Sequence, residues 1–199
     1  MKLDSLADMP IERTLGLRWN LHDDTFVFTV CLHSDQDGTG SCTKRSLLSR
    51  VMSVFDQLGF LASFTVRAKI LLQDVWRAGL GWDDELPAEL QSRWDKWWRE
   101  VRSVSTLKIP RCYSPKIPQS TVELHVFCDA SSKAFAAVAY LRVLSQDEAD
   151  TAFVSAKTRM APLKPMSIPR LELQAAVMGS RLAQRIKSQQ SLKLDSIRL

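Results

Sequence analysis

The sequence lacks the apolar segments that membrane insertion and secretion require. None of its apolar runs approaches the roughly 18–20 residues that cross a bilayer. The first residues, Met1-Lys2-Leu3-Asp4, carry charge where a signal peptide needs an apolar stretch. We therefore expect an intracellular protein without a membrane partner.

The sequence also lacks the closely spaced ligand pairs of a zinc site. Its three histidines are scattered, and no two of its four cysteines form a Cys-x-x-Cys pair. Cys31 and His33 can share one face of a strand, but two ligands do not make a site. The default expectation is free thiols in a reducing compartment. The cysteines are Cys31, Cys42, Cys112 and Cys128.

The composition is that of a globular protein with an uneven charge. The 199 residues are 45% hydrophobic and 25% charged, which suits one large domain or two small ones. The net charge is +5, and residues 151–199 contain nine basic residues against Glu172 and Asp195, a local charge of +7. Such a stretch fits a polyanionic partner, above all nucleic acid, and it fits a solvated helix face equally well.

The first part of the chain alternates between apolar and polar residues. This period of two over residues 13–33 predicts a β-hairpin, and the polar residues 34–41 predict a loop. Thr43 is a suitable N-cap for a helix of apolar spacing, and Gly59 stands where a helix-ending glycine is expected.

Two more helices are expected before the proline-rich residues 110–120. The spacing predicts one over residues 64–78, with Trp76 facing inward and Gly79 closing it, and another after Pro87. The indoles of this third helix could stack nucleobases, but core packing already explains their spacing. They belong to Trp94, Trp97 and Trp98.

The proline-rich residues 110–120 predict an extended linker and a domain boundary. After them the period returns to two, so the fold class expected is α+β. The expected strands cover residues 122–129, 135–142, 152–156 and 195–199. A helix is expected over residues 167–188, and its buried face is expected to consist of Leu173, Ala176, Val177, Ala183 and Ile186.

Asp129 and Glu172 are the most informative pair of acidic residues. One ends a predicted strand and the other lies early in a predicted helix, so they can converge if the helix packs across the sheet. Convergent carboxylates bind hard cations such as Mg²⁺, and two such ions can promote phosphodiester hydrolysis. The residues alone favour simpler roles, namely a turn-forming aspartate and a glutamate placed by the helix dipole.

Several separate motifs resemble the Pol polyprotein of BEL/Pao-type LTR retrotransposons, in that family's order, from about Thr14 to Leu199. Residues 124–131 (LHVFCDAS) and 136–140 are similar to the opening hairpin of a retroelement RNase H domain. Residues 168–173 (IPRLEL) resemble the start of its first helix. The upstream motifs similar to this family are residues 15–20 (LGLRWN), 43–45 (TKR), 55–61 (FDQLGFL) and 80–87 (LGWDDELP).

The resemblance implies a division of the chain. Residues 1–42 would be the end of a reverse-transcriptase palm with its β-hairpin, and residues 43–109 a helical thumb and connection. Residues 110–120 would be the proline-rich linker. Residues 121–199 would be the N-terminal part of an RNase H-like domain, a truncated mixed sheet with a helix.

The resemblance also implies an activity, partners and a location. The intact polyprotein would copy RNA into DNA and cleave the RNA of RNA/DNA hybrids with Mg²⁺, and Asp129 and Glu172 match the family's metal ligands. The implied partners are an RNA/DNA hybrid or template-primer and the remainder of the Pol polyprotein. The implied location is the cytoplasm, in a virus-like particle or ribonucleoprotein.

The sequence departs from the family pattern in ways that limit the expected activity. It has no Tyr-x-Asp-Asp motif, so polymerase activity is not expected, and no Asp-Thr/Ser-Gly motif, so proteolysis is not expected. The third RNase H carboxylate belongs at the end of the fourth strand, whereas Asp195 precedes that strand. Residues 1–199 alone are therefore expected to show little nuclease activity. The alternative is an inactive nucleic-acid-binding or interaction relic of such an element.

Basic residues suggest where nucleic acid could bind. The predicted helices of residues 43–78 carry six basic residues against Asp56 and Asp74, a local charge of +4. A thumb helix could lay such residues along phosphates, although basic residues on helices are commonly just solvated. The candidate nucleic-acid-binding residues are Lys44, Arg45, Arg50, Arg67, Lys69 and Arg170.

Overall fold

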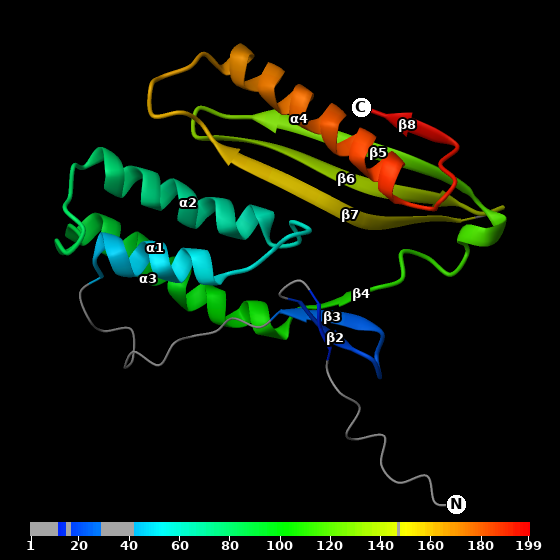
Figure 1. The fold of residues 1–199 in the computed structure, drawn as a ribbon, viewed down its shortest axis with the longest axis horizontal. Helices are drawn as coiled ribbons and strands as arrows, with labels where there is room; N and C mark the ends of the chain where they lie inside the picture. Colours follow the sequence, from blue (N-terminus) through cyan, green and yellow to red (C-terminus); the bar gives the residue numbers. More distant parts are fainter. Residues whose placement is uncertain (1–11, 15–16, 29–41, 147) are drawn as a thin grey trace, which may run out of the picture.

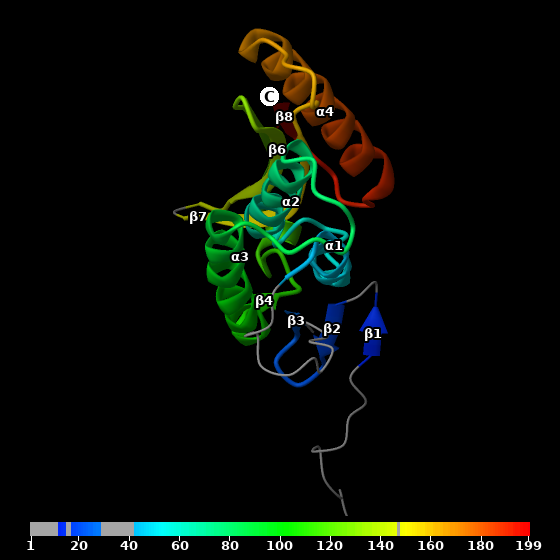
Figure 2. The same cartoon turned by 90° about the vertical axis from the view of Figure 1, so that its left-hand side faces the viewer.

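The structure, a computed structural model, describes residues 12–14, 17–28, 42–146 and 148–199. It is a mixed α+β fold, as expected, with two sheets and a helical region between them (Figures 1 and 2). The elements are β1 (Glu12–Thr14), β2 (Leu17–Asn20), β3 (Thr25–Phe28), α1 (Lys44–Ser53), α2 (Ala62–Arg77), α3 (Ala88–Val101), η2 (Arg102–Thr106), β4 (Lys108–Pro110), η3 (Ile117–Gln119), β5 (Thr121–Ala130), β6 (Ala134–Leu144), β7 (Ala149–Met160), α4 (Ile168–Gln189) and β8 (Ser196–Arg198).

The small sheet has the strand order β1-β2-β3-β4. It contains the expected hairpin, since β2 and β3 pair antiparallel with Leu17 opposite Phe28. Residues 29–33, which include Cys31 and His33, lie outside the described residues. Pro110 was expected to begin an extended linker, but it lies in β4 opposite Thr25. A proline is tolerated there because β4 is an edge strand, and the remaining linker is interrupted by η3.

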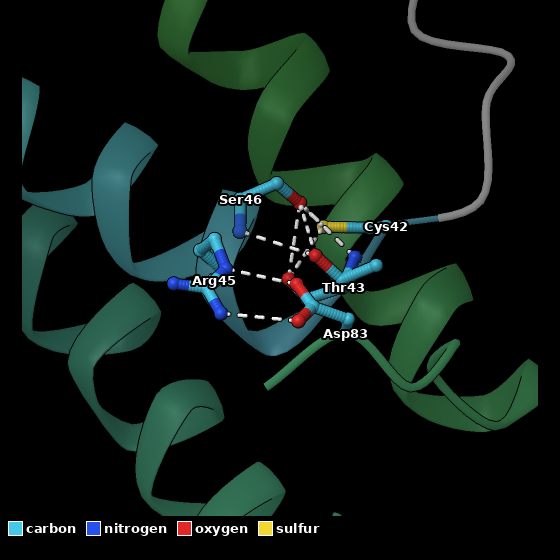
Figure 3. Close-up of polar contacts among 5 residues, drawn as sticks. All are labelled: Cys42, Thr43, Arg45, Ser46 and Asp83. Atoms are coloured by element: carbon cyan, nitrogen blue, oxygen red, sulfur yellow. Dashed lines mark hydrogen bonds and ion pairs between the residues drawn. The ribbon is translucent and has the colours of Figure 1, made fainter. Parts of the chain in front are cut away.

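The first helix begins where the sequence predicts. The Thr43 hydroxyl accepts a hydrogen bond from Ser46 N, and Ser46 Oγ accepts one from Thr43 N, which completes a capping box (Figure 3). The helix ends at Ser53, however, and not at Gly59. Gly59 instead lies in the loop before α2, where its backbone N–H and that of Leu61 donate to the Asp56 carboxylate.

The helical region has its own core. The buried side chains of Trp94, Trp97 and Trp98 confirm the apolar stripe predicted for α3, and their rings contact one another. Trp97 also stacks on Phe64 of α2 with ring centroids 5.0 Å apart. Core packing thus accounts for the three indoles. The inward position expected for Trp76 is wrong, because this side chain is 45% exposed.

The larger sheet has the order β7-β6-β5-β8, in which β8 is parallel to β5 and the other pairs are antiparallel. The helix α4 packs across it on β5 and β6 (Figure 1). The apolar core between helix and sheet includes Leu124, Val126 and Leu141. No described helix meets the length and hydropathy needed to span a bilayer.

The buried face of α4 differs from the one expected. Ala183 and Ile186 are buried as predicted, but Ala176, Leu173 and Val177 are exposed, Leu173 by 66%. The buried stripe consists of Leu171, Ala175, Gly179, Leu182, Ala183 and Ile186. Small side chains on this stripe let the helix approach the sheet closely, and the larger apolar residues therefore lie on the flank.

The helical region is joined to the edge of the larger sheet. Ala156 N and Ser155 Oγ of β7 both donate to the carbonyl of Leu58, each over 2.8 Å. Gln73 of α2 donates to the carbonyl of Ala161 over 2.6 Å, and the rings of Phe60 and Phe153 lie 4.8 Å apart. These contacts cover an edge strand that would otherwise expose unpaired backbone groups.

Candidate functional site

Asp129 and Glu172 lie at the same end of the larger sheet. Asp129 is the penultimate residue of β5, and Glu172 lies close to the N-terminal end of α4 (Figure 1). Leu171 and Ala130, the direct neighbours of the two acidic residues, share one apolar cluster with Phe135. Packing of α4 on the sheet therefore brings the two segments together.

The two carboxylates are exposed and reach this end from different faces of the sheet. Side chains alternate along a strand, so Asp129 shares the face of Phe127, away from Val126, which packs under α4. Glu172 directly follows the buried Leu171 and extends from α4, which covers the face of the sheet that carries Val126. Any ion held by both would lie at the end of the sheet.

The contacts of Asp129 and Glu172 are not those of a turn-forming aspartate or of a glutamate placed by the helix dipole. In the turn after β5 the side-chain contacts are made by Ser131, whose hydroxyl accepts from the backbone of Lys133 and Ala134. The Asp129 carboxylate forms no hydrogen bond or ion pair with any described residue. Glu172 is the fifth residue of α4, beyond the first turn where the helix dipole favours acidic groups, and its carboxylate too has no partner in the described chain.

The two carboxylates supply only some of the ligands that a hard divalent cation needs. Carboxylate oxygens without competing partners are the ligands that Mg²⁺ prefers. Within the part of the chain that the structure describes, however, no group of three or more His, Cys, Asp or Glu side chains is placed to hold a metal ion. Two carboxylates would leave most of the coordination shell to water or substrate oxygens.

Lys44 and Arg45, two of the candidate phosphate contacts, are engaged within the protein. Lys44 is 5% exposed; its ammonium lies 3.5 Å from the ring centroid of Trp76 and donates to the carbonyl of Leu80 over 2.9 Å. Arg45 donates through Nε and Nη2 to the two carboxylate oxygens of Asp83, and Figure 3 shows this bidentate pair at the start of α1.

The other four candidate phosphate contacts differ in their surroundings. Arg67 pairs with Glu100 over 2.7 Å, and Arg50 lies over the ring of Trp98. Lys69 is half-buried. The Arg170 side chain is exposed and has no partner among the described residues.

Unpaired cations gather instead on β7 and α4, where Arg170 is the only candidate predicted from the sequence. The side chains of Arg159, Arg181 and Arg185 are exposed and form no ion pair with any described residue. The local charge of +7 over residues 151–199 was the signal of this region. The fold was needed to show that these three residues line one groove.

Glu123 lies nearer the opposite end of β5 and anchors the fourth strand. Its carboxylate is within hydrogen-bond distance of His125 and accepts from Arg142, Arg198 and Ser196. The hydrogen bond with His125, followed by those with the arginines, lowers the pKa of Glu123 to about 2, although burial acts in the opposite direction. Since Arg198 and Ser196 belong to β8, this carboxylate fixes β8 beside β5.

A family model, described as a Pao retrotransposon-like RNaseH-like domain, matches residues 43–199. The chain belongs to this family. The assignment confirms the resemblance drawn from the sequence motifs and agrees with the RNase H-like sheet of β5–β8. This Pao-type chain matches no curated protein.

Among solved structures, the Pao-type chain is similar to a foamy viral protease-reverse transcriptase in complex with an RNA/DNA hybrid. The identity is 12% and the TM-score 0.43, and the similarity covers 91% of this chain and 24% of that one. The Pao-type chain thus corresponds to about a quarter of the length of that viral protein.

Proposed function

We propose that this chain is part of a retrotransposon Pol polyprotein and engages an RNA/DNA hybrid, with Asp129 and Glu172 as metal ligands of an RNase H-type site. The observation that carries the proposal is the placement of two exposed, unpartnered carboxylates at one end of a Pao-type sheet. Mg²⁺ bound there would activate water and stabilise the leaving oxygen in hydrolysis of the RNA strand.

The chain's own residues position these ligands. Leu171 and Ala130 share an apolar cluster, which fixes the start of α4 against the end of β5. Asp129 and Glu172 would each contribute negative charge and oxygen ligands, and neither needs to break an existing contact to do so. Because two carboxylates leave most of the coordination to other oxygens, we expect residues 1–199 alone to cleave a hybrid very slowly.

The rest of the chain fits the same polyprotein. Residues 1–42 would be the end of a reverse-transcriptase palm and residues 43–109 its thumb and connection. The linker of residues 110–120 would lead to the RNase H-like part, residues 121–199. Template-primer and the remaining Pol polyprotein would be the partners, in a cytoplasmic particle. A nucleic-acid-binding relic without metal chemistry is the competing function.

A Mn²⁺ titration followed by NMR separates these possibilities. A paramagnetic ion bound by both carboxylates should broaden the amide signals of residues 128–130 and 171–173 first. The variants Asp129→Asn and Glu172→Gln should each abolish this selective broadening. The control Glu89→Gln removes an exposed, unpartnered carboxylate on α3 and should leave it unchanged. Broadening that spreads evenly over acidic residues, or that survives Asp129→Asn, would contradict the metal site.

A further inference from the structure

A groove runs between α4 and the edge strand β7, with a volume of about 760 Å³. Its walls carry Lys157 and Arg159 from β7 and Arg181 and Arg185 from α4, and no carboxylate lines it among the described residues. The exposed apolar side chains of Leu173 and Val177 continue the α4 wall. The groove therefore combines an apolar strip with four cationic groups.

The arginines of this groove differ from several arginines elsewhere in the described chain that pair with carboxylates. Arg45, Arg67 and Arg93 each lie within 2.8 Å of a carboxylate oxygen. The guanidinium groups of Arg159, Arg181 and Arg185 contact no carboxylate, and the Lys157 ammonium reaches only the carbonyl of Gln57, at 3.4 Å. Four cations held together without counter-charge favour an anionic ligand.

The position of the groove indicates which anion. Leu173 and Gln174, at one end of the groove, directly follow Glu172. From Leu173 to Arg185 the helix rises roughly 18 Å, at 1.5 Å per residue, so the cations continue from the proposed metal site along α4. Guanidinium groups bind phosphate oxygens in bidentate fashion, and cations on both walls can hold one sugar-phosphate strand between them.

We propose that this groove binds a single-stranded segment of nucleic acid through its sugar-phosphate backbone, beside the carboxylate site. The proposal rests on the proposed function for the identity of the strand, but the contacts need no metal. Phosphates would pair with the four cations while Leu173 and Val177 contact sugars or bases. Without exposed aromatic rings in its lining, the groove would show little base preference.

The test is fluorescence anisotropy of a labelled 12-nucleotide single strand, as DNA and as RNA, with EDTA present. The double variant Arg181→Gln/Arg185→Gln should bind at least about tenfold more weakly at low salt, and its salt slope should fall by about 1.4, or 0.7 per lost phosphate contact. The control Lys96→Gln/Lys187→Gln removes the same charge outside the groove and should bind like wild type. The variant Arg181→Lys/Arg185→Lys keeps the charge and should retain the slope.

Each other outcome would overturn the proposal. Equal weakening by the groove and control variants would show that only net charge matters. Displacement of the strand by a polyglutamate peptide of equal length at equal concentration would make the groove a site for acidic protein segments instead. The Mn²⁺ titration of the two carboxylates uses no oligonucleotide and the strand measurement uses no metal, so failure of the metal site and failure of the groove are separable. Circular dichroism melting would confirm that each variant is folded.

Discussion

A β-carbon added to Gly59 would lie 2.2 Å from the carbonyl oxygen of Ala156 and 2.8 Å from its nitrogen. Gly59 also has a φ of +84°, which side-chain-bearing residues rarely adopt. The loop before α2 can therefore reach the edge of β7 only with glycine at this position. The contact between the helical region and the RNase H-like sheet depends on that close approach.

The variant Gly59→Ala should therefore lower the free energy of unfolding by roughly 2–4 kcal/mol, because backbone strain and a clash with backbone atoms both contribute. Gly79→Ala is the matched control, since Gly79 has a φ of +69° but faces open space. It should cost only about 1 kcal/mol. Urea denaturation of both variants checks this, and equal losses would show that the approach to Ala156 is unimportant.

Glu123 should make the docking of β8 sensitive to acid. Its pKa is about 2 in the folded protein, below the ordinary value of 4.5. A lowered pKa means that the carboxylate stabilises the fold above pH 4.5 and that this contribution is lost as the pH falls from about 4.5 toward 2. Amide exchange of Ile197 and Arg198 should accelerate over this window, and Glu123→Gln should show fast exchange already at pH 6. Exchange that is independent of pH in the wild type, after correction for intrinsic rates, would contradict this role.

Lys44 should matter for stability and not for nucleic-acid affinity. The variant Lys44→Met removes the ammonium over Trp76 and leaves the carbonyl of Leu80 without its donor. We expect a loss of about 1–3 kcal/mol in the free energy of unfolding, measured by urea denaturation. Arg45→Gln breaks an exposed ion pair with Asp83 and should change the free energy of unfolding much less. A large drop in oligonucleotide affinity for a folded Lys44→Met protein would contradict this assignment.

The sequence was informative where one local rule decides the structure. The cap at Thr43, the indole stripe of α3 and the strand β5 each follow from residue type and spacing alone. The face of α4 could not be predicted in this way. Leu173 and Val177 are helically spaced and more apolar than Ala175 and Gly179. The small residues nevertheless form the buried face, because they allow the helix to approach the sheet.

Long-range contacts explain the other differences. Sequence spacing could place Asp129 and Glu172 at related ends of a strand and a helix, and the fold brings those ends together. It could not show that Lys44 is enclosed by Trp76 and Trp82, because these residues are far apart in the chain. Nor could it show which basic residues remain unpaired, since that depends on the carboxylates nearby in space.

The metal site proposed at Asp129 and Glu172 would couple divalent-ion binding to binding of an RNA/DNA hybrid. The most direct measurement is the hybrid affinity of residues 1–199 with and without Mg²⁺ at constant ionic strength. We expect Mg²⁺ to tighten wild-type binding by at least about tenfold, or roughly 1.4 kcal/mol, and Asp129→Asn to abolish this gain while Glu89→Gln retains it. Affinity that does not change with Mg²⁺, or a gain that survives Asp129→Asn, would contradict the proposed metal site.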